Sequence, residues 1–118
     1  MERPAADKDA AMATATEPTS LDRQLRYGVL AARTVAVSFR AAMESAERHL
    51  SVPDAERAEI KGRWRAWALE TLEGYAAKLE TLTASDPKAM DDNAEALRRY
   101  RDELDRAFEM VRGTRDDG

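Results

Sequence analysis

Arginines are the residues of this chain best suited to ligand chemistry, because a guanidinium binds a carboxylate or a phosphate through paired hydrogen bonds. Counting from the two predicted chain reversals places Arg40, Arg63 or Arg65, and Arg106 at similar heights in a helical bundle. With Arg33, which could also line a pocket between helices, they form the candidate anion-binding set Arg33, Arg40, Arg63, Arg65 and Arg106. Acidic residues at the same height favour exposed ion pairs as the simpler interpretation; these residues are Glu44, Glu59, Asp105 and Glu109.

The segment Lys61–Trp67, KGRWRAW, interleaves basic residues with two tryptophans. Such a pattern can contact phosphates while the indole rings stack on bases, which is how single-stranded nucleic acids are bound. However, Trp64 and Trp67 also fall on the apolar stripe of a predicted helix. We therefore favour a packing role in which the tryptophans lie against Val35 and Phe39, and nucleic-acid binding through Lys61–Arg65 is the alternative.

Other chemistry has few candidate residues. His49 is the single histidine and cysteine is absent, so disulfides, thiolate metal ligands and a cysteine nucleophile are excluded. No spare imidazole remains for a serine triad, and no glycine-rich phosphate loop occurs. The sequence predicts no metal site and no cofactor, and it favours a non-catalytic protein.

Composition points to an all-α domain. The chain has 118 residues, of which 43% are hydrophobic and 36% charged, and its formal net charge is −4. Such a length suits one domain, and the scarcity of β-branched and aromatic residues leaves little from which to build strands. Because the N-terminal segment resembles no secretory signal and the longest apolar run is short and carries two arginines, we expect a cytoplasmic protein without a membrane span.

Two breaks divide the chain into three long helices. Pro53 restarts the chain after the first helix, and Ser85 or Asp86 can cap the third, with Pro87 at its first position. The predicted helices cover residues 20–50, 53–83 and 87–112, in an antiparallel up-down-up bundle. We expect the domain to span 20–113, between a disordered N-terminal tail at 1–19 and a frayed C-terminal tail at 114–118.

The first predicted helix has two apolar stripes on roughly opposite sides. The first, here called the inner stripe, consists of Leu21, Leu25, Gly28, Ala32, Val35, Phe39, Ala42 and Ala46. The second, here called the outer stripe, consists of Tyr27, Leu30, Thr34, Val37 and Ala41. A helix that is apolar on two sides is normally covered on both, either by two neighbours in its own bundle or by another chain.

Arg101 falls inside the apolar arc of the third predicted helix, between Leu97 and Leu104. A guanidinium in such a place must reach the solvent or pair with a carboxylate. Glu70 lies at the matching height on the second helix, so the sequence predicts a buried Arg101–Glu70 pair.

These observations lead to three functional hypotheses. The first is a helical protein–protein interaction or assembly module, a homodimer or a subunit binding another helical protein, whose partner-binding face is the outer stripe. The second is a small-molecule-binding protein or enzyme with an arginine-lined pocket between helices. The third is nucleic-acid binding, which the acidic net charge disfavours.

Overall fold

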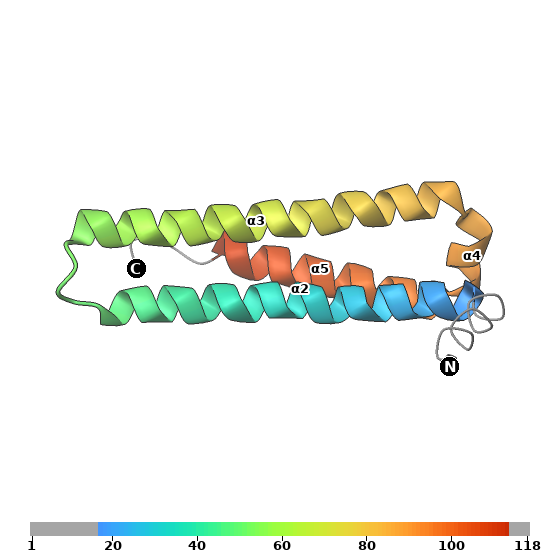
Figure 1. The fold of residues 1–118 in the computed structure, drawn as a ribbon, viewed down its shortest axis with the longest axis horizontal. Helices are drawn as coiled ribbons and strands as arrows, with labels where there is room; N and C mark the ends of the chain where they lie inside the picture. Colours follow the sequence, from blue (N-terminus) through green and yellow to red (C-terminus); the bar gives the residue numbers. More distant parts are fainter. Residues whose placement is uncertain (1–16, 114–118) are drawn as a thin grey trace, which may run out of the picture.

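The computed structural model describes residues 17–113, with side chains from Ser20 onward. It is all-α, and its two longest helices, α2 (Glu17–Arg48) and α3 (Asp54–Ser85), run antiparallel as a hairpin (Figure 1). The helical start at Glu17 places residues 17–19 in α2 rather than in the predicted tail. The rest of the predicted tails, residues 1–16 and 114–118, lies outside the described residues.

The third predicted helix is divided into two pieces, α4 (Pro87–Asp92) and α5 (Ala94–Gly113). Asp86 caps α4, as the sequence predicts, because its carboxylate accepts a hydrogen bond from the Ala89 backbone N–H at 3.1 Å. The predicted continuity over 87–112 is wrong at Asn93, whose amide donates to the Ala89 carbonyl at 2.8 Å. Asparagine competes for backbone hydrogen bonds in this way, and it therefore disfavours helix interiors.

The core lies where α2 contacts both α3 and α5. From α2 it takes residues of the predicted inner stripe, among which Ala32 and Phe39 are fully buried. The other helices contribute mainly Ala68, Leu72 and Leu79 of α3, Met90 of α4, and Tyr100, Leu104, Ala107 and Val111 of α5. The inner stripe is thus the seam that joins the three helices.

Gly28 provides the closest approach between α2 and α5. The tip of the Tyr100 ring lies directly over Gly28, so that a methyl group at this position would overlap the ring carbons Cζ, Cε1 and Cε2. The absence of a side chain at Gly28 therefore lets an α5 aromatic ring pass over α2. Tyr100 is 8% exposed in this position.

The helix α5 covers only part of the hairpin. Arg65 of α3 donates a hydrogen bond to the carbonyl of Val111, in the last turn of α5. Beyond that level, α2 and α3 continue toward their connection as a two-helix arm (Figure 1). α5 is 20 residues long, against 32 for each of the hairpin helices, which explains this difference.

Candidate interaction surface

The outer stripe of α2 is exposed along its whole length. The exposed fractions are 63% for Tyr27, 54% for Leu30 and 57% for Val37, and Thr34 and Ala41 between them are also exposed. Isolated exposed apolar side chains are ordinary, whereas a row of them at helical spacing is a candidate interaction surface. This stripe is therefore the first candidate functional site.

Within the described residues, neither neighbouring helix covers the outer stripe. α3 and α5 both pack on the other side of α2, against buried residues such as Leu25, Val35 and Phe39. α2 is thus central in its own bundle and touches two neighbours, as one hypothesis predicts, but both neighbours lie against the inner stripe and leave the outer stripe exposed. Among the described residues of this single chain, nothing packs over Tyr27, Leu30 and Val37.

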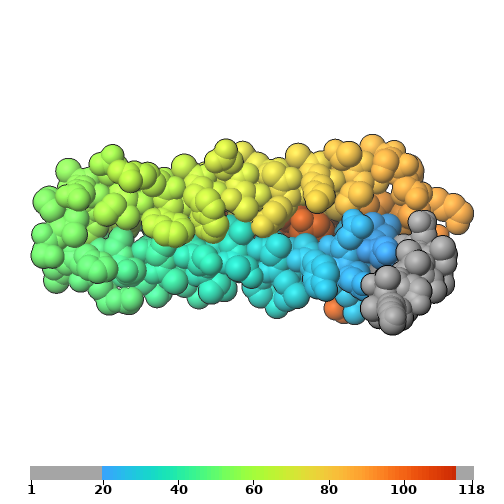
Figure 2. Space-filling view, in the orientation of Figure 1, coloured from blue at the N-terminus to red at the C-terminus, as the bar shows by residue number. Residues whose placement is uncertain are grey.

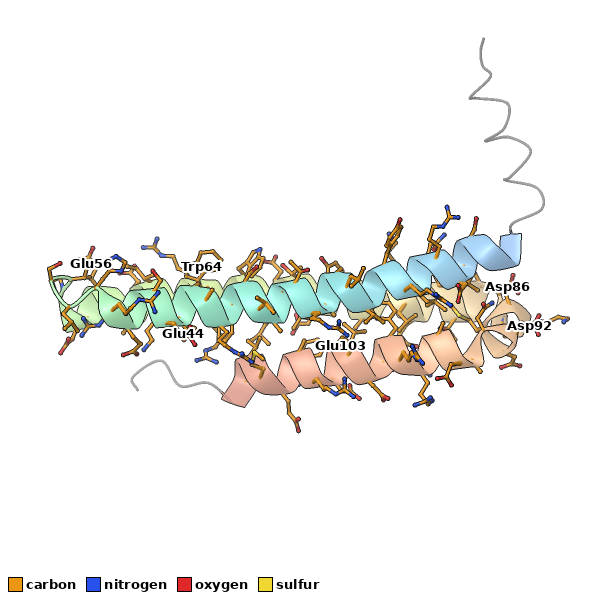
Figure 3. All side chains as sticks on the ribbon, turned by 90° about the horizontal axis from the view of Figure 1, so that it is seen from below. Glu44, Glu56, Trp64, Asp86, Asp92 and Glu103 are labelled. Atoms are coloured by element: carbon orange, nitrogen blue, oxygen red, sulfur yellow. The ribbon has the colours of Figure 1, made fainter. Side chains whose placement is uncertain are left out.

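The two tryptophans are at the surface, which corrects the predicted packing against Val35 and Phe39. Trp64 and Trp67 are each 39% exposed, and their rings meet edge to face with centroids 5.4 Å apart. The Arg65 guanidinium takes the predicted place, 5.7 Å from the centre of the Phe39 ring. Trp64 projects on the side of the hairpin that faces away from α5 (Figure 3). The tryptophans thus add apolar surface on α3.

The basic residues around the tryptophans do not form a cationic face. Lys61 is buried and pairs with Glu47 of α2, and Arg65 turns toward the carbonyl of Val111. Arg63 remains outside but pairs with Glu59 at 3.2 Å. The hydrogen bond and charge of Lys61 hold the pKa of the Glu47 carboxyl below its ordinary value. Because these cations already have partners, the structure gives little support to phosphate binding at Lys61–Arg65.

The candidate anion-binding arginines do not converge on one site. Arg33 of α2 and Arg106 of α5 both contact the buried carboxylate of Glu103, at 3.3 and 3.4 Å. Figure 3 shows Glu103 between α5 and α2. Arg40 is an exposed residue of α2, whereas Arg63 and Arg65 make the separate contacts described above. The Arg33–Glu103–Arg106 group therefore joins two helices instead of leaving charge free for a ligand.

Arg101 does not form the predicted buried pair. Its side chain is 47% exposed and lies 3.9 Å from the carboxylate of Glu80, not from Glu70. Glu70 is exposed elsewhere on α3. The physical reason is that the core-facing side of α5 passes through Tyr100, Leu104 and Ala107, which leaves Arg101 beside the core rather than within it.

Two of the grooves along α2 border residues of the outer stripe. One lies between α2 and the start of α5, next to Leu30, with a volume of about 500 Å³ and charged residues such as Arg26 and Glu95 at its edge. The other lies between α2 and α3, has a volume of about 260 Å³, and is lined by all three tyrosines of the chain, Tyr27, Tyr75 and Tyr100. A small part of α5 is visible between α2 and α3 on this face (Figure 2). No sequence pattern predicts this second groove, although Gly28 inside the inner stripe indicates a close approach between helices.

Residues 17–113 contain no group of three or more potential metal-ligating side chains of histidine, cysteine, aspartate or glutamate. Within the same range, the helices are either too short or too polar to cross a bilayer. No protein-family model matches the chain, and no curated protein or solved structure is significantly similar to it.

Proposed function

We propose that this chain is a non-catalytic helical assembly module that forms a homodimer through the outer stripe of α2. The observation that carries this proposal is the exposure of Tyr27, Leu30 and Val37 in a row on one helix, whose opposite side is already occupied by the core. A second α2 presents the same apolar row, so a two-fold arrangement satisfies both copies at once.

Two of the three arginines beside the stripe are already paired with carboxylates of their own chain. Arg26 and Arg33 follow its edge, and both already contact carboxylates, Arg26 with Asp22 at 2.9 Å and Arg33 with Glu103. Pairing within each copy reduces the repulsion between arginines that two α2 helices would bring together. The small side chains of Thr34 and Ala41 in the stripe also permit close helix approach.

The expected dimer is of moderate strength. Burying a large apolar side chain contributes about 1.5–3 kcal/mol, and each copy offers three of them in the stripe. The loss of rotational and translational freedom on association costs about 4–15 kcal/mol and offsets much of this gain. Trp64 and Trp67 of α3 are further exposed apolar residues at about the height of residues 37–42 of α2, because Arg65 between them contacts Phe39.

Light scattering after size exclusion, over a range of protein concentrations, tests the proposal. The wild-type chain is expected to reach twice the mass of the monomer as concentration rises. The double substitution Leu30→Glu, Val37→Glu should keep the helical circular-dichroism spectrum and remain monomeric, because four carboxylates would face one another in the dimer.

A matched control carries the same added charge on a different surface. Ala66 and Ala77 are exposed on the outer side of α3, so Ala66→Glu, Ala77→Glu should dimerise like the wild type. A wild-type chain that stays monomeric at millimolar concentration contradicts the proposal. Equal loss of dimer in the two double variants contradicts the location of the interface.

A further inference from the structure

The groove between α2 and α3 that contains Tyr27, Tyr75 and Tyr100, here called the tyrosine groove, holds a buried polar group without a partner. Tyr100 is more than nine-tenths buried, and among residues 17–113 its hydroxyl forms no hydrogen bond. The end of the ring that bears this hydroxyl lies over Gly28, which itself lines the groove. A buried hydroxyl without a partner costs about 1–3 kcal/mol, so an acceptor in the groove would remove this penalty.

The charge of the tyrosine groove is one-sided. Lys78 lines it, and no carboxylate does. Lys78 also forms no ion pair within the part of the chain that the structure describes, whereas Lys61 and Lys88 each have an acidic partner. An unpaired ammonium group beside an uncharged wall favours a ligand with one negative charge.

The remaining walls of the groove are apolar. Leu25, Ala31, Leu79 and Leu82 line it together with the tyrosine rings, and Gln24 is the further polar side chain. A cavity of about 150 Å³ can hold one benzene ring, so a volume of about 260 Å³ can hold a ring with a short acidic arm. Ligand sites commonly combine such apolar walls with a few polar groups that fix orientation.

We propose that the tyrosine groove binds a small apolar monocarboxylate, about the size of one aromatic ring with an acidic arm. The apolar body lies against the leucines and tyrosine rings, an oxygen of the ligand accepts the hydrogen bond of the Tyr100 hydroxyl, and Lys78 balances the charge. Burial raises the pKa of Tyr100 above its ordinary value, with a smaller contribution from Tyr75, so the hydroxyl remains a hydrogen-bond donor at neutral pH. Tyr27 belongs both to this groove and to the outer stripe, whereas the other lining residues of the groove lie outside the proposed dimer surface.

Titration with phenylacetate, followed by nuclear magnetic resonance on protein with ¹³C-labelled tyrosine, tests this proposal directly. Because the chain has three tyrosines and all three line the groove, every tyrosine signal should shift on binding. Single tyrosine-to-phenylalanine variants assign the signals. Phenylacetamide, which has the same shape without the charge, should bind about tenfold more weakly.

Three variants separate the roles of the polar groups. Tyr100→Phe keeps the ring over Gly28 and should weaken phenylacetate binding about tenfold without lowering the free energy of unfolding. Lys78→Met keeps most of the apolar stem and should weaken binding to a similar degree. Lys88→Met is the control, because Lys88 is exposed on α4, does not line the groove and should leave the affinity unchanged.

Three results would overturn the proposal. The first is the absence of tyrosine shifts at about 10 mM phenylacetate, a concentration well above a millimolar dissociation constant. The second is equal affinity in the wild type, Tyr100→Phe and Lys78→Met. The third is phenylacetate binding by the monomeric Leu30→Glu, Val37→Glu variant but not by the wild type. In that case the second copy of the chain would fill the groove in the wild-type dimer. If the wild type is monomeric and binds phenylacetate, the proposed dimer is contradicted while the proposed ligand site still stands.

Discussion

The two apolar stripes of α2 have almost the same spacing of side chains, yet their surroundings are opposite. Phe39 and Ala32 of the inner stripe are fully buried by α3 and α5, whereas Val37 and Leu30 of the outer stripe are more than half exposed. Helical periodicity therefore identifies which residues share a side, but it does not show what covers that side. Substitutions in the inner stripe are therefore expected to change the free energy of unfolding, whereas substitutions in the outer stripe are expected to change association between chains.

The largest contrast is expected between Phe39→Ala and Val37→Ala. Removing the buried Phe39 ring leaves a cavity and should lower the free energy of unfolding by about 3–5 kcal/mol. Val37→Ala should change it by no more than about 0.5 kcal/mol in the monomer, because Val37 makes its main contribution to the interface. Urea unfolding at a concentration below that of dimerisation measures both values. Equal losses would show that the outer stripe is covered within the monomer.

A smaller contrast tests the approach of Tyr100 to the inner stripe. Gly28→Ala places a methyl group against the Tyr100 ring and should lower the free energy of unfolding by about 1–3 kcal/mol. Gly74→Ala is the matched control, because nothing lies within 4 Å of a methyl group there and alanine favours a helix by about 1 kcal/mol. Thermal melts of the two variants should therefore shift in opposite directions. A stabilising Gly28→Ala would contradict the packing of Tyr100.

The smallest effect on the free energy of unfolding is expected in the two-helix arm, from removal of the Glu47–Lys61 ion pair. The pKa of Glu47 in the folded chain lies below its ordinary value of 4.5, so its contribution to stability is present above that pH and is lost as the pH falls through the folded value. The difference in stability between the wild type and Glu47→Gln should therefore shrink as the pH falls from 7 to about 3.

Glu44→Gln provides the control for this pair, since Glu44 is exposed on the same helix and forms no ion pair among the described residues. Urea midpoints at several pH values measure both variants. A Glu47→Gln difference that stays constant with pH would show that the contact with Lys61 does not stabilise the fold.

The fold was largely predictable from the sequence, because local signals determine it. Pro53 and the Asp86-Pro87 pair separate the helices, and the periodicity of the inner stripe identifies the face that packs. The sequence does not predict the break at Asn93, because a single weak helix former does not reveal whether its side chain will form a hydrogen bond with the backbone of the preceding turn.

The environments of individual side chains on α3 and α5 were less predictable. Trp64 and Trp67 fit a helical stripe, but the position of α5 decides that Arg65 rather than a tryptophan contacts Phe39. Arg101 lies near Glu80 rather than the predicted Glu70 for a related reason, since a small rotation of a helix changes which carboxylate is nearest. Such choices depend on helix rotation about its own axis, which stripes define only approximately.

Gly28, which lies under the Tyr100 ring, affects how α5 is positioned along the axis of α2. Sliding α5 along α2 by one turn, about 5.4 Å, would carry the ring to the level of Gln24 or Ala32, where a Cβ atom stands in its way. Gly28 therefore acts as a notch that accepts the ring at one height only. In a bundle whose other contacts are mostly interchangeable aliphatic groups, this notch selects a single register among several similar ones.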